Sequence, residues 1–185
     1  MVIIQERVAG LSEAALAKFV ARARHAVGLR GKVSVLVTSS RELQGLNHRF
    51  RGKNKATDVL SFPAMPGLLR GFAGDVAISA EIATRNARRL GHTVAEEIRI
   101  LTLHAVLHLA GYDHELDDGE MDRKESRLRK SLGLPAGLIE RSGKPVLGKG
   151  LSFNNKRKPN SQVRRPVVST LANTRTASRA KRTVR

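Results

Sequence analysis

The feature that most constrains the fold is a nearly all-apolar segment that also carries two histidines. Between Ile98 and Leu109, isoleucine, leucine, valine and alanine cover almost every side of a predicted helix. Thr93 is its predicted N-cap, and Glu96 at the third helical position completes a capping box. A helix that is apolar all round is buried, so we predict that this helix is the central element of the domain.

Two histidines interrupt this apolar helix, and a third follows it. His104 and His108 are four residues apart, so their rings project from one helix face, one turn apart. Gly111 favours the left-handed conformation that ends a helix, which lets the chain bring His114 back toward the first two. Ionisable rings on an apolar face are costly unless they are paired or bound to a metal. We therefore predict that His104, His108 and His114 hold one metal ion.

The available side chains indicate the kind of metal site. The chain has no cysteine, so a transition-metal site must use His, Asp or Glu. Three protein ligands with an open fourth position are typical of catalytic zinc, here one ion per chain, although nickel, cobalt or copper also accept three imidazoles. The spacing H-x-x-x-H-x-x-G-x-x-H matches a zinc-protease signature, but Ala105 stands where those proteases carry a glutamate base. This difference argues against a peptidase.

Strands and helices alternate along the rest of the chain. Hydrophobic periodicity and cap residues predict helices over 12–27, 40–50, 79–90, 94–109 and 117–132, and strands over 2–6, 33–37, 58–62 and 75–79. We expect the stretch from Pro63 to Gly74 to be a loop. This order favours an α/β or α+β domain with a small sheet, whose strand pairing stays open.

The net charge of +18 is concentrated toward the end of the sequence. Residues 141–185 contain 13 Lys and Arg and no Asp or Glu, whereas residues 1–140 carry 21 basic and 16 acidic side chains. We predict a folded domain over 1–140 and a disordered basic tail over 141–185. Such a tail favours phosphate backbones, although a solvated extension without a partner has the same composition. No apolar run could span a bilayer and no secretory signal is recognisable, so we expect a cytoplasmic protein without a membrane partner.

Three separated motifs resemble the bacterial YbeY family: Leu46–Pro63 (LNHRFRGKNKATDVLSFP), Gly74–Ser79 (GDVAIS) and Leu107–His114 (LHLAGYDH). The likeness spans about residues 1–140. It implies an α+β domain with a small mixed β-sheet flanked by helices, and a central buried helix carrying a three-histidine zinc site. It also implies a single-strand-specific, metal-dependent endoribonuclease, a hydrolase that acts in maturing the 3′ end of 16S rRNA, in ribosome biogenesis and in ribosome quality control.

The same resemblance suggests roles for further residues. Arg51 matches a family arginine in the active cleft, and a guanidinium can bind a phosphate through two hydrogen bonds. Lys53 and Lys55 lie on the same loop and could extend a phosphate-binding surface, although solvated lysines would look the same. Asp75 is a further candidate, for orienting a ligand histidine, although a residue that only ends a turn would look the same. Ala105 replaces a residue that is usually glycine in the family, and because it is also small we expect little consequence.

Two alternatives and several mechanistic questions stay open. The resemblance implies ribosomal RNA of the small subunit as partner, with ribosomal proteins or GTPases as further partners. A ribosome-associated RNA-binding factor with a structural zinc and no cleavage activity is the main alternative, and an unusual zinc peptidase is the second. Either water or the 2′-hydroxyl could attack the phosphorus. Asp113 and Glu115 are near the histidines, but the sequence does not give their side-chain directions, so no general base is assigned.

Overall fold

The computed structural model describes residues 1–65, 71–114 and 116–135, so the predicted tail over 141–185 lies outside the described residues. The strands are β1 (Val2–Ile4), β2 (Lys32–Thr38), β3 (Val59–Pro63) and β4 (Phe72–Ser79). The helices are α1 (Glu13–Val27), α2 (Ser40–Arg51), α3 (Ala80–Leu90), α4 (Val94–Leu109) and α5 (Glu120–Leu132). The α+β class is confirmed. Within the described part of the chain, no helix combines the length and the apolar character needed to cross a bilayer.

The four strands form one mixed sheet in the order β1-β2-β4-β3. β1, β2 and β4 are parallel, whereas β3 runs antiparallel to β4 and lies at the edge. Parallel neighbours need crossover connections, and α1 supplies the one between β1 and β2. The chain then passes through α2 and β3 before it returns to the sheet centre as β4. This topology places the segment between α2 and β3 at the sheet edge.

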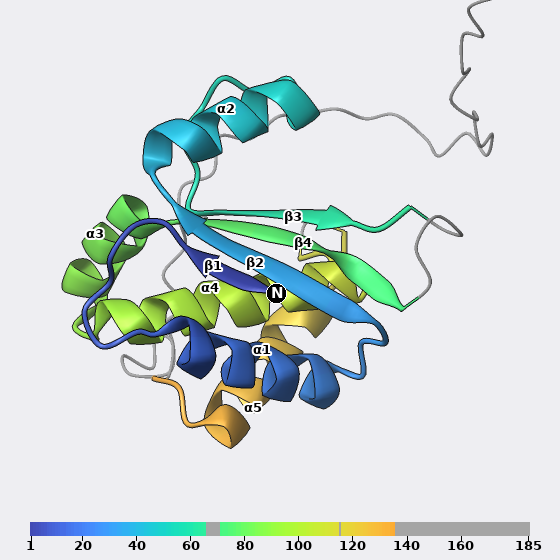
Figure 1. Ribbon diagram of the computed structural model, residues 1–185. Helices are drawn as coiled ribbons and strands as arrows, with labels where there is room; N and C mark the ends of the chain where they lie inside the picture. The colour runs from blue at the N-terminus through green and yellow to red at the C-terminus, as the bar shows by residue number, and fades with distance from the viewer. Residues whose placement is uncertain (66–70, 115, 136–185) are drawn as a thin grey trace, which may run out of the picture. The chain divides into compact units, whose positions relative to one another are not determined.

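α4 is the central buried helix, as the sequence predicts. It packs against the sheet and contacts α1, α3 and α5, while α2 lies on the other side of the sheet (Figure 1). Ile98, Leu103 and Leu107 of α4 are fully buried, and each such side chain contributes about 1.5–3 kcal/mol relative to an exposed one. A smaller cluster under α2 contains Leu43 and Leu60. The packing of α4 therefore fixes the positions of His104 and His108 near its C-terminal end.

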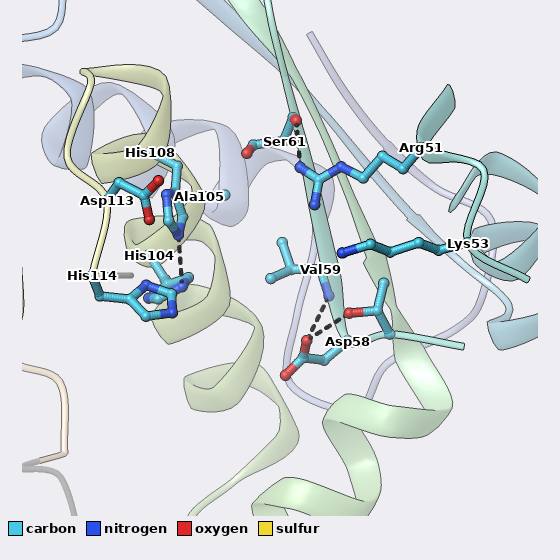
Figure 2. Close-up of a pocket in the computed structure, with 11 residues that line it drawn as sticks. Arg51, Lys53, Asp58, Val59, Ser61, His104, Ala105, His108, Asp113 and His114 are labelled. Atoms are coloured by element: carbon cyan, nitrogen blue, oxygen red, sulfur yellow. Dashed lines mark hydrogen bonds between the residues drawn. The ribbon is translucent and has the colours of Figure 1, made fainter. Parts of the chain in front are cut away.

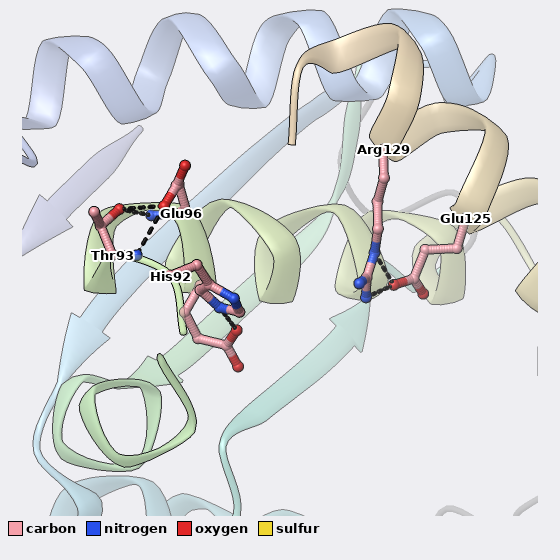
Figure 3. A network of polar contacts seen from close by, with 6 residues as sticks. His92, Thr93, Glu96, Glu125 and Arg129 are labelled. Atoms are coloured by element: carbon pink, nitrogen blue, oxygen red, sulfur yellow. Dashed lines mark hydrogen bonds and ion pairs between the residues drawn. The ribbon is translucent and has the colours of Figure 1, made fainter. Parts of the chain in front are cut away.

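Side-chain caps set the starts of the first four helices. The N-cap side chains of these helices all accept a hydrogen bond from the backbone N–H three residues on: Ser12, Ser39, Ser79 and Thr93. Thr93 and Glu96 form the predicted capping box, shown in Figure 3. α5 differs, because it begins at Glu120 and the Asp117 carboxylate accepts the N–H groups of Glu120 and Met121, each at 3.0 Å. The predicted start at 117 is thus three residues early.

The expected loop from Pro63 to Gly74 is too long, because β4 already begins at Phe72. Gly74 lies inside β4, opposite Pro63, with φ +149°. A Cβ at this position would collide with the Phe62 carbonyl oxygen and lie 2.8 Å from Leu109 Cδ2. Glycine here lets β4 pass close to β3 and to the end of α4, so it is a close-approach residue and not a turn residue.

Candidate active site

Three histidines meet at the C-terminal end of α4. The Nε2 atoms of His104 and His108 are 3.1 Å apart, and the His114 ring centroid lies 5.4 Å from that of His104 and 5.3 Å from that of His108. One nitrogen of each ring lies within 4.8 Å of the other two. The structure therefore brings together the three predicted residues, which we call the histidine wall (Figure 2).

The turn after α4 returns His114 to the first two histidines. Gly111 adopts φ +92°, the left-handed conformation that the sequence predicts for it. Its N–H donates to the His108 carbonyl at 3.0 Å, and the Tyr112 N–H donates to the Leu107 carbonyl at 3.1 Å. These bonds satisfy the last carbonyl groups of the helix and fix where the next residues leave it.

A buried carboxylate on α5 is hydrogen-bonded to His104. Glu125 Oε2 lies 2.8 Å from His104 Nδ1. Glu125 Oε1 accepts from Arg129 Nε at 2.9 Å, the contact shown in Figure 3. An ionised carboxylate only accepts hydrogen bonds, so His104 Nδ1 carries the proton and Nε2 keeps its lone pair toward His108. Carboxylate partners of this kind are typical of metal-bound histidines. Glu125 is absent from the sequence-based site, although it interrupts the apolar stripe of α5 between Met121 and Leu128.

Burial and neighbouring charges set the protonation of these groups. Burial lowers the pKa of His108 below its ordinary value, and the nearby rings of His104 and His114 lower it further. Burial alone would raise the pKa of Glu125, but the hydrogen bond with His104 and the charge of Arg129 outweigh it and lower that pKa. A neutral imidazole is the form that binds metal, so the lowered His108 pKa favours metal binding near neutral pH. The donor set fits a zinc ion.

Arg51 and Lys53 face the histidine wall across one pocket, and we call these two residues the basic wall (Figure 2). The pocket measures about 470 Å³. Between the two walls it is bounded by the edge of the sheet and the segment before it: Thr57, Asp58, Val59 and Ser61. Arg51 Nη2 donates to the Ser61 carbonyl at 3.2 Å, which turns the guanidinium toward β3. The pocket thus has a three-histidine metal-ligand set on one side and a guanidinium on the other.

The remaining predicted residues fall in different places. Lys55 is exposed and does not line this pocket, but it lines the pocket next to it. Asp113 lines the pocket beside the histidines, and Glu115 lies outside the described residues. Asp75 lies inside β4 with its side chain exposed, and it does not line the pocket. The carboxylate beside His104 is that of Glu125 and not, as suggested from the sequence, that of Asp75. Ala105 is buried next to His104, so no carboxylate stands at the position of the protease base.

Comparison with known proteins decides the family. The sequence model described as Endoribonuclease YbeY matches residues 3–133. The chain belongs to the endoribonuclease YbeY family. A protein of that name from Koribacter versatilis is 60% identical over 146 residues, covering 79% of this chain and 94% of the relative. Another from Solibacter usitatus is 49% identical over 134 residues, covering 72% and 88%. A solution structure of a Thermotoga maritima protein is 30% identical, covers 71% of this chain and 89% of its own, and has a TM-score of 0.48.

The match to the YbeY family contains both walls of the pocket. Residues 3–133 run from β1 to the end of α5 and include Arg51, the three histidines and Glu125. The resemblance read from the three motifs is therefore confirmed. The basic residues of 141–185 lie beyond the matched range.

Proposed function

We propose that this protein is a zinc-dependent endoribonuclease that cleaves single-stranded RNA and acts in the cytoplasm on the 3′ end of 16S rRNA and in ribosome quality control. One observation carries the proposal: a three-imidazole donor set and an arginine face each other across a single pocket. Membership in the endoribonuclease YbeY family supports RNA as the substrate class.

The histidine wall is the proposed zinc site, with one ion held by His104, His108 and His114. Zinc bound by three protein ligands supplies a Lewis acid that polarises a phosphate oxygen or a water molecule. Glu125 keeps the proton on Nδ1 of His104 and leaves Nε2 available as a ligand atom. Arg129 holds that carboxylate in its ionised form by its own positive charge.

The basic wall is the proposed phosphate site. A guanidinium has five N–H donors, and the bond from Arg51 Nη2 to the Ser61 carbonyl leaves further donors for a phosphate. Such donors stabilise the negative charge that grows on the phosphate oxygens in the transition state. Lys53 adds a point charge on the same side of the pocket. Because the pocket receives a backbone phosphate between two walls, an unpaired strand fits it better than a stiff duplex.

A peptidase reaction has less support from the same residues. Ala105 offers only a methyl group where a zinc peptidase of this spacing has its glutamate base. A phosphate, unlike a peptide carbonyl, also makes full use of the guanidinium of Arg51. These two side chains together favour phosphodiester cleavage.

His114→Ala tests the enzyme against the RNA-binding factor without cleavage. His114 is exposed and follows α4, so its removal leaves the core packing in place. The matched control is His25→Ala, which removes an exposed histidine in the last turn of α1. We expect His114→Ala to lose cleavage of a single-stranded fragment from the 3′ end of 16S rRNA while its RNA affinity stays near that of His25→Ala.

Two results would contradict the proposal. Wild-type protein that binds the fragment but leaves it intact in the presence of zinc would favour the binding factor. Equal cleavage by His114→Ala and His25→Ala would mean that the three histidines do not carry the chemistry.

A further inference from the structure

A second pocket lies on the other side of the segment that carries the basic wall. It measures about 460 Å³, and Arg51, Lys53, Thr57 and Asp58 line both pockets. Its remaining lining comes from α2, α3, β3 and the connection between α2 and β3: Asn47, Lys55, Ala56, Leu60, Ile82 and Arg85. The two pockets are therefore adjacent, with the basic wall between them. The second volume is within the range of about 300–1,000 Å³ that ligand pockets occupy.

The second pocket combines an apolar floor with cations at its rim. Leu60 is 2% exposed and Ile82 is half-buried, while Lys55 and Arg85 are exposed. In the described part of the chain, no ion pair engages Lys55 or Arg85. The carboxylate of Asp58 also lines the pocket, where its Oδ1 accepts the Val59 N–H at 2.9 Å, so one negative charge lies beside the four cations of the lining, Arg51, Lys53, Lys55 and Arg85. A ribose or base suits the apolar floor, and a phosphate suits the cations.

Side chains of α2 hold the lysine-bearing loop in place. Asn47 Nδ2 donates to the Lys55 carbonyl at 2.7 Å, and Gln44 Nε2 donates to Asn54 Oδ1 at 2.9 Å. Asn47 is buried, so the first of these bonds is shielded from water. A loop that is already ordered loses less conformational freedom when a ligand binds. The backbone of the loop that carries Lys53 and Lys55 is thus held in place before any ligand binds.

We propose that the second pocket binds a nucleotide of the RNA strand next to the phosphodiester that is cut, with Arg85 and Lys55 binding its phosphate. This inference rests on the proposed function, because it assigns a flanking part of the same substrate. The residues shared by the two pockets let one strand pass from the histidine wall, over Arg51 and Lys53, to Arg85. Cleavage then depends on substrate length: a strand that reaches Arg85 is bound better than a single dinucleotide.

The matched pair Arg85→Ala and Arg88→Ala tests this assignment. Both residues are exposed on α3 and both changes remove one positive charge, but Arg88 lines neither pocket. The probes are a uridine dinucleotide with one phosphodiester and a single-stranded uridine 12-mer. We expect the ratio of kcat/KM for the 12-mer to that for the dinucleotide to fall about tenfold in Arg85→Ala, since a lost hydrogen bond to a charged group costs about this much, and to stay unchanged in Arg88→Ala. Lys55→Ala should lower the same ratio.

A binding measurement separates this inference from the proposed cleavage. In the His114→Ala background, 12-mer affinity is measured against salt concentration, and Arg85→Ala should reduce the slope of log Kd against log salt by about 0.7, the loss of one phosphate contact. A reduced slope, found together with wild-type protein that cuts no RNA in the presence of zinc, would sustain the second pocket and contradict the proposed function. If the wild-type protein cleaves RNA but Arg85→Ala and Arg88→Ala show the same kcat/KM ratio and the same salt slope, the assignment of the second pocket is overturned. Free uridine monophosphate competing as well as the 12-mer would also overturn it.

Discussion

His104 on the histidine wall and Arg51 on the basic wall face the same pocket, but the protein supports them in different ways. His104 is half-buried and bonded to the Glu125 carboxylate, which Arg129 in turn holds. Arg51 is exposed, and its described contact is one hydrogen bond to the Ser61 carbonyl. The first residue is fixed by the packing of two helices, whereas the second depends on the end of one helix and an edge strand.

This difference matches what each side of the pocket is proposed to bind. A metal ion requires ligand atoms at fixed distances, so its ligands need rigid helices and carboxylate partners behind them. A phosphate on a flexible strand can be met by long exposed side chains, which keep their charge at low cost in contact with water. Changes on the histidine wall should therefore alter metal binding, while changes on the basic wall should alter only the handling of RNA.

His108→Ala should abolish the stabilisation of the fold by zinc. Zinc added to chelator-treated wild type at 100 times its Kd should stabilise the fold by about 2.7 kcal/mol, read as a rise in Tm. His108→Ala should lose this rise, because alanine keeps the helix but removes a ligand. Arg51→Ala should keep the full rise. An equal rise in His108→Ala and wild type would remove the distinction between the two walls.

Arg51→Ala should lower kcat/KM for single-stranded RNA by about 10²–10³-fold, the loss expected for a donor that stabilises transition-state charge. Zinc content and Tm should stay at wild-type values. Arg51→Lys should recover only part of the activity, because an ammonium group cannot bind a phosphate through the planar fork of a guanidinium. A loss of zinc in Arg51→Ala would show that the two walls are not independent.

Glu125→Gln should weaken zinc affinity by about 10–100-fold, because the amide holds His104 less firmly than the carboxylate does. The measurement is competition with a chromogenic chelator. Glu120→Gln is the control, since Glu120 is exposed on the same helix. Cleavage by Glu125→Gln should return at saturating zinc. Unchanged zinc affinity would show that Glu125 supports only the packing of α5.

Lys53→Ala should have the smallest effect, a reduction of RNA affinity that disappears as salt rises. Lys53 is exposed and contributes one point charge to the pocket, so the slope of log Kd against log salt should fall by about 0.7. Zinc affinity should not change. A loss of cleavage in Lys53→Ala as large as that of Arg51→Ala would place Lys53 at the reacting phosphate.

The sequence predicts the histidine wall because its geometry is local. Helical spacing places His104 and His108 on one face, and the conformation of Gly111 accounts for the return of His114. Caps such as Thr93 are predictable for the same reason, since their partners lie three residues away. Glu125 is not predictable in this way, because the packing of α5 on α4 brings it to His104 from 21 residues along the chain.

The basic wall lacks such a local signal. Arg51 is one of many arginines, and only the family resemblance singles it out. Arg85 is equally inconspicuous, because its place beside Lys55 arises from the contact between α2 and α3. The suggestion for Asp75 has no support in the structure, because its side chain on β4 is exposed and lies outside the pocket lining. A carboxylate within an apolar helical stripe, as in α5, is the better sign of a buried partner.

The most direct test of the zinc-dependent endoribonuclease is metal content measured with cleavage on one preparation. Protein purified without chelator is analysed by mass spectrometry and assayed on single-stranded ribosomal RNA, before and after chelation. We predict about one zinc per chain, cleavage that is lost on chelation, and cleavage that returns when zinc is added. Protein that contains no metal, or cleavage that is indifferent to its removal, would contradict the account.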